Sequence, residues 1–92
     1  MLPGFNHTIN YKGQKVHIQT EDHGRERPEI VSHVFLEGKV IATQRTTYKN
    51  LLQEKDLDLK KEIKHLMQDQ HKKVLKAVVD GSYDKELGLK KS

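Results

Sequence analysis

Residues 5–20, "FNHTINYKGQKVHIQT", show the clearest strand pattern in the chain. Apolar and polar side chains alternate on both sides of Lys12-Gly13, which is the pattern of two half-buried strands. A two-residue loop that contains glycine suits a tight hairpin, because glycine readily adopts the positive φ that such turns require. Residues 5–11 and 14–20 are therefore expected to pair as antiparallel strands.

The loop also predicts the register of this hairpin. A slip by one residue would divide the apolar side chains between the two faces of the sheet. His7 is thus expected on the apolar face and His17 on the other, so the hairpin cannot bring these two histidines to one metal ion. The expected pairs are Tyr11 with Gln14, Ile9 with Val16, and His7 with Ile18.

A second hairpin is expected at residues 29–36 and 39–46, with a turn at Glu37-Gly38. If this loop also has two residues, Val34 faces Ile41 and Phe35 faces Val40. Unlike the first hairpin, this one is apolar on both faces, and one layer of helix can cover only one of them. One face would hold Ile30, Val34, Leu36 and Ile41, and the opposite face Val31, His33, Phe35, Val40 and Ala42.

The period becomes helical after the fourth strand. "TTYKNLLQ" predicts a short helix that begins at Thr46 or Thr47. Asp56 and Asp58 suit the start of a longer helix at about residues 57–80, which would end at Gly81. Its continuous inward stripe would consist of Leu59, Ile63, Leu66, Met67, Gln70, Val74, Ala77 and Val78.

One helix from Tyr48 to Asp80 is the alternative, since no glycine or proline interrupts that stretch. In either case the sequence predicts an α+β fold: a four-stranded antiparallel meander of two hairpins, then a short and a long C-terminal helix, the long one on one sheet face. We expect a single domain at residues 1–84 and a flexible polar tail at 85–92.

Composition limits the classes of function. The chain of 92 residues has no cysteine, which excludes disulfides, thiolate catalysis and cysteine zinc sites. It has no apolar run near the ~20 residues that span a bilayer, so no membrane association is expected. The net charge of +4 is divided equally between residues 1–50 and 51–92, so the basic residues form no arm or tail. A bacterial cytoplasm is the expected location.

The polar side chains suggest no reaction. His65 has Glu62 and Asp69 at helical spacing, but it is expected to face solvent, and nothing resembles HExxH. Ser32 and His33 are adjacent on a strand and must point to opposite faces. The sequence therefore predicts no catalytic residue, no cofactor and no metal site.

Four stretches resemble a family of small bacterial proteins of uncharacterised function: "FNHTINYKGQKVHIQTEDHG", "SHVFLEGKVIATQRTTY", "LMQDQHKKVLKAVVDG" and "SYD". The resemblance extends from Phe5 to Asp84. It implies one domain and carries over no activity or ligand. If "HIQTED" is typical of the family, the polar residues Gln19, Glu21 and Asp22, expected to point outward, become of interest.

We therefore expect a non-enzymatic binding or adaptor module that acts through contacts with an unknown protein partner. The expected interface is the second apolar face of the sheet, with Val31, His33, Phe35, Val40 and Ala42. The apolar stripe of the long helix is expected to be longer than the sheet can cover. Two copies could bury this excess, or the second apolar face, in a homodimer. Alternatively, Leu51, Tyr83 or Leu87 of the same chain could cover the excess. The alternative function is nucleic-acid binding by the basic face of the long helix, with Lys61, Lys64, Lys72 and Lys76.

Overall fold

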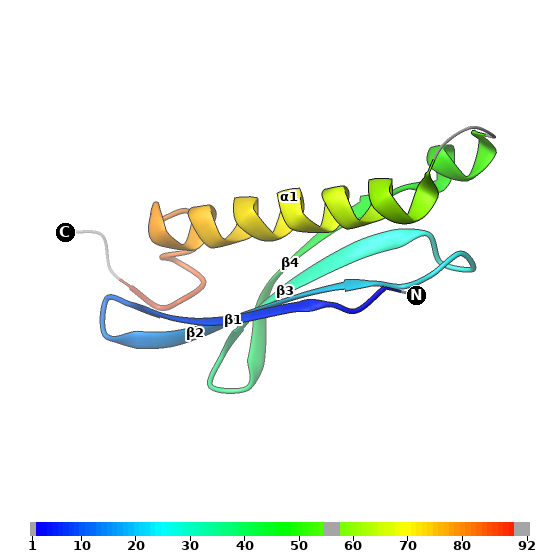
Figure 1. Cartoon of the computed structure of the whole chain (residues 1–92). Helices are drawn as coiled ribbons and strands as arrows, with labels where there is room; N and C mark the ends of the chain where they lie inside the picture. Colours follow the sequence, from blue (N-terminus) through cyan, green and yellow to red (C-terminus); the bar gives the residue numbers. More distant parts are fainter. Residues whose placement is uncertain (1, 55–57, 90–92) are drawn as a thin grey trace.

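Four strands and one long helix form the molecule (Figure 1), a computed structural model that describes residues 2–54 and 58–89. Strands β1 (Phe5–Tyr11), β2 (Gln14–Asp22), β3 (Glu29–Leu36) and β4 (Lys39–Thr47) form one antiparallel sheet in the order β1-β2-β3-β4. The 3₁₀ helix η1 (Lys49–Gln53) and helix α1 (Leu59–Val79) follow. The predicted α+β meander with a long C-terminal helix on one face is confirmed. The expected helix start at residue 57, like Asp56, lies outside the described residues.

The register of the first hairpin is as predicted. Ile9 pairs with Val16 and His7 with Ile18, so His7 lies on the face that α1 covers. His17 lies on the opposite face. The turn residues Lys12 and Gly13 both have positive φ, at 48° and 82°, as tight hairpin turns require.

The register of the second hairpin differs from the prediction. Val34 pairs with Ala42 instead of Ile41, while Phe35 pairs with Val40 as expected. Ile41 is the extra residue of a β-bulge, and a bulge shifts every later residue of its strand to the other face. The placement of Ala42 beside Phe35 was therefore wrong: Ala42 lies on the α1 side and packs against the core.

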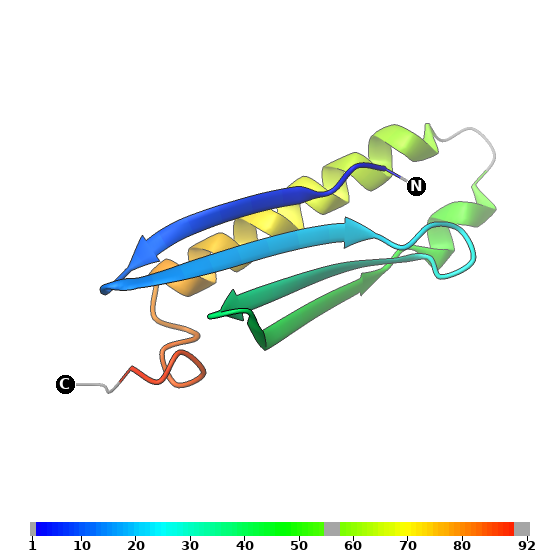
Figure 2. The ribbon, with the colours of Figure 1, turned by 90° about the horizontal axis from the view of Figure 1, so that it is seen from below.

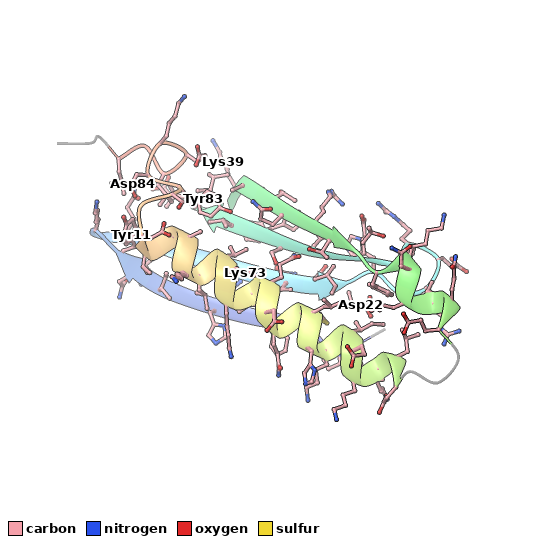
Figure 3. All side chains as sticks on the ribbon, turned by 90° about the horizontal axis from the view of Figure 1, so that it is seen from above. Tyr11, Asp22, Lys39, Lys73, Tyr83 and Asp84 are labelled. Carbon is pink, nitrogen blue, oxygen red and sulfur yellow. The ribbon has the colours of Figure 1, made fainter. Side chains whose placement is uncertain are left out.

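Helix α1 begins where the sequence indicates. The Asp58 carboxylate accepts a hydrogen bond from the Lys61 backbone N–H at 3.2 Å, which caps the first turn. The helix ends at Val79, and Gly81 follows with a φ of 92°. Figure 3 shows α1 lying across the sheet, where it packs on β1, β2 and β3.

The core between α1 and the sheet has two apolar clusters. One surrounds Ile18, Val34 and Val78, and the other surrounds Ile30 and Met67. The segment after α1 belongs to the first cluster, because Leu87 is only 2% exposed and Tyr83 and Leu89 pack beside it.

The C-terminal segment therefore differs from the expected flexible tail. Residues 85–88 lie in turns against the first hairpin, where the Gln14 side-chain amide donates to the Leu87 carbonyl at 3.2 Å. The Tyr11 hydroxyl donates to Asp84 at 2.7 Å. Leu51 and Tyr83 also pack against the two clusters, as partly buried side chains. Residues 90–92 lie outside the described residues.

Candidate functional site

One face of the sheet has no described element packed on it. Figure 2 looks onto this face, with α1 behind the strands. We call it the open face, and by strand alternation it carries the residues that point away from α1. Its centre lies on β2 and β3 and consists of His17, Val31, His33 and Phe35, with Val40 beside them on β4.

The predicted interface residues differ in their exposure. Val40 is 50% exposed, and His33 and Phe35 are half-buried. Val31 is only 1% exposed, since it lies between its cross-strand neighbours Glu21 and Arg45. Four of the five predicted residues thus share the open face, and Ala42 does not.

Ring contacts and hydrogen bonds hold the centre of the open face in place. The Phe35 ring lies between two imidazoles, with centroid distances of 5.9 Å to His17 and 5.8 Å to His33. Each histidine is in turn bonded to a threonine of an edge strand, His17 to Thr8 at 2.9 Å and His33 to Thr43 at 3.0 Å. The sequence predicted that His33 and Phe35 share a face of the sheet, but it did not predict these ring contacts and hydrogen bonds.

The open face is nearly neutral. Lys15 and Arg45 supply positive charge, and Glu21 and Glu29 supply negative charge. Glu29 accepts from Arg45 at 3.0 Å. A face with an aromatic centre and balanced charge is typical of a protein contact and lacks the concentrated positive charge that phosphates need.

A layer of hydrogen-bonded polar side chains crosses the core on the other side of the sheet. It separates the two apolar clusters and connects all four strands with α1. In order, the bonds join His7 to His71 (2.7 Å), His71 to Thr20 (2.7 Å), Thr20 to Ser32 (2.7 Å), Ser32 to Gln70 (2.9 Å), and Gln70 to Thr46.

The layer has a structural role. Thr20 and Ser32 are 0% exposed, so no substrate can reach their hydroxyls. Their bonds fix how β2 and β3 sit beneath α1, since each buried polar atom finds its partner in one arrangement only. Gln70 was expected on the inward stripe of the helix, whereas His71 was not. The available signal was a break in the apolar pattern at Thr20 and Ser32, which lie opposite each other.

The pKa of His71 is lowered from its ordinary value, chiefly because burial disfavours the charged imidazolium and also because His7 and His17 are nearby. Both ring nitrogens of His71 already have partners, in His7 and Thr20. A proton added to His71 would therefore have to be accommodated inside the core.

This arrangement predicts a pH dependence of stability. Below about pH 6.5 the unfolded chain protonates residue 71 while the folded chain resists it, so stability should fall as the pH decreases. The slope from this residue is at most about 1.4 kcal/mol per pH unit, and it disappears above about pH 7.5. Urea unfolding between pH 5 and 8 measures it, with His71→Gln expected to reduce the slope. Equal slopes in the wild type and His71→Gln would contradict the assignment.

Asp22 has a different environment from the one expected. It is 4% exposed, lies on the α1 side of β2 and accepts from the Tyr48 hydroxyl at 2.6 Å. Burial alone would raise the pKa of Asp22, but hydrogen bonds from Tyr48 and from the amides of Gly24 and Leu2 outweigh it and hold the pKa below its usual value. The expected outward orientation of Asp22 was wrong. Its carboxylate connects the end of β2 with Leu2, Gly24 and Tyr48.

The predicted nucleic-acid-binding lysines belong to neither the open face nor the polar layer. Lys61, Lys64, Lys72 and Lys76 are exposed on α1, and Glu62 and Asp69 on the same helix reduce their combined charge. Within residues 2–54 and 58–89 there is no group of three or more histidine, cysteine, aspartate or glutamate side chains that could hold a metal ion. No helix in the described residues is long and apolar enough to cross a membrane.

Comparisons with protein-family models, with curated proteins and with solved structures find no match for this chain.

Proposed function

We propose that this chain is a small non-enzymatic binding module that acts through contacts with another protein, and that the open face of the sheet is its binding surface. The observation that supports the proposal most is the one-sided construction of the domain. Helix α1 closes one face, while the opposite face keeps an aromatic and apolar centre with nothing described upon it. Exposed apolar patches with a polar rim mark interaction sites.

The chemistry of the open face defines the kind of partner. Phe35 and Val40 offer apolar surface, His17 and His33 offer hydrogen-bonding rings, and the charges balance. Such a surface fits a partner patch with an apolar centre and few charges. Phe35 is expected to act as the anchor, because aromatic side chains near the centre of an interface carry most of its binding energy.

Affinity capture from cells that express the protein tests this proposal with three matched baits. The wild type and Lys64→Glu, a charge change at an exposed residue of α1, are expected to retain the same partner. Phe35→Glu is expected to lose at least about 90% of it, since a charge at the centre of an interface costs more than ~1.4 kcal/mol. Circular dichroism of all three baits controls for folding. Equal capture by Phe35→Glu and the wild type would contradict the proposal.

The alternative is nucleic-acid binding by the lysine face of α1, which is supported by the exposure of Lys61, Lys64, Lys72 and Lys76. A salt titration of binding to generic DNA and RNA distinguishes the two functions. For the module proposed above, no binding is expected at micromolar protein even at low salt. Micromolar binding that falls steeply with salt and is lost in Lys64→Glu would favour the alternative.

A further inference from the structure

The two edge strands of the sheet differ in how well they are protected against pairing with a strand of another chain. A free edge presents unpaired backbone N–H and C=O groups, and proteins usually protect it with charges, proline or a bulge. β4 has Lys39 and Arg45 as well as the bulge at Ile41. β1 has none of these: "FNHTINY" contains no charge and no proline, and it pairs with β2 without a register shift. In the part of the chain that the structure describes, no strand pairs with β1 on the side away from β2.

The free edge of β1 also has a defined hydrogen-bonding pattern. In an antiparallel pair, the residues that exchange both backbone bonds alternate along the strand. The two-residue turn makes Tyr11 and Gln14 such a pair, and Ile9 with Val16 is the next one. The backbone groups of Asn6, Thr8 and Asn10 therefore point away from β2. All three side chains are exposed.

We propose that two copies of this chain associate through their β1 strands, antiparallel and centred on Thr8, to form one continuous sheet. The sequence of β1 is close to a palindrome about this residue. The register pairs Thr8 with itself and Asn6 with Asn10 of the second copy, which are the residues whose backbone groups are free. These three pairs would form about six backbone hydrogen bonds.

The same register gives suitable neighbours on the α1 side of the sheet. Phe5 would lie beside Tyr11 of the second copy, and His7 beside Ile9. Phe5 and Ile9 are only half-buried in one chain, so the pairing would remove apolar surface from water. No like charges meet, because β1 has no charged residue. A two-fold interface needs a surface that complements itself in this way.

The helices permit this arrangement. An antiparallel edge pair with its two-fold axis through the sheet places both α1 helices on the same side. Since α1 packs across β1, β2 and β3, the two helix axes would be about three strand spacings apart, roughly 14 Å. Directly packed helices are 8–10 Å apart, so the pair has room for side chains between them and does not clash.

This proposal concerns an edge, whereas the proposed function concerns a face, and the two can fail separately. One seven-residue strand pair makes a small interface, so we expect a dissociation constant of roughly 1–100 μM. Light scattering at about 300 μM protein should give a mass well above the 10.7 kDa of one chain. A mass of one chain at that concentration would overturn the proposal.

Two threonines offer a matched test of the edge. Thr8 on β1 and Thr43 on β4 are both exposed, and each is bonded to a histidine of the neighbouring strand. Thr8→Lys would place two like charges opposite each other and should raise the dissociation constant at least about tenfold. Thr43→Lys and Phe35→Glu should leave it unchanged. Dissociation by either of these and not by Thr8→Lys would overturn the proposal.

Disulfide trapping tests the register without relying on those variants. The chain has no cysteine, so single introduced cysteines are unambiguous. The pair of Asn6 and Asn10 from two copies should have Cα atoms about 5.5 Å apart, within disulfide range. A mixture of Asn6→Cys and Asn10→Cys should crosslink under oxidation more than either alone, because two copies of residue 6 are about 14 Å apart. Crosslinking that is no stronger in the mixture would contradict the antiparallel register.

Discussion

Replacing Gln70 with alanine is expected to lower the free energy of unfolding by about 2–4 kcal/mol. Gln70 is 8% exposed, and its amide nitrogen donates to the Ser32 hydroxyl at 2.9 Å and to the Gln44 carbonyl at 3.2 Å. Its oxygen accepts from the Thr46 hydroxyl. Truncation would remove the hydrogen bond to the buried Ser32 hydroxyl and those to Gln44 and Thr46, and would open a cavity under α1.

Urea unfolding of Gln70→Ala measures this loss, and Gln68→Ala is the matched control. Gln68 is the same residue type two positions earlier on α1, and it lies outside the polar layer. Its replacement should change stability by no more than about 0.5 kcal/mol. Equal effects of the two substitutions would show that the layer does not hold the helix to the sheet.

Leu87→Ala is expected to cost about 2–4 kcal/mol, as for other leucines truncated in a core. Leu87 is 2% exposed and packs with Val16 and Val78 although it lies beyond the end of α1. Val79→Ala is the control, because Val79 is 58% exposed and its truncation should have little effect. Thermal unfolding compares the two, and a Leu87→Ala protein as stable as the wild type would place the C-terminal segment outside the domain.

The sequence predicted the elements of the fold because local patterns encode them. The period of two in β1 and β2, together with the glycine of the turn, was enough for the register of the first hairpin. The bulge in β4 could not be predicted in this way. Whether the bulge is stable depends on how Ile41 and Ala42 pack against the core, and no local sequence pattern indicates it.

In the candidate site, too, local sequence patterns predicted some features, while others depend on tertiary packing. Alternation was enough to place His33 and Phe35 on one face, but it could not identify which side chains become partners across strands. The His17–Phe35 contact and the bond from His71 to Thr20 join residues far apart in the sequence. Leu87 was named as one residue that could cover the helix, but its polar segment was assigned to a flexible tail, and only the fold brings it into the core beside the first hairpin.

The open face of the sheet is the surface that we propose to bind another protein. Photo-crosslinking in cells that express the protein tests it most directly, with benzoylphenylalanine in place of Phe35 or of Lys64. We expect one discrete adduct with another protein from position 35, lost when Val40→Lys is added, and none from position 64. An adduct from position 64 alone, or none from position 35, would contradict binding through the open face.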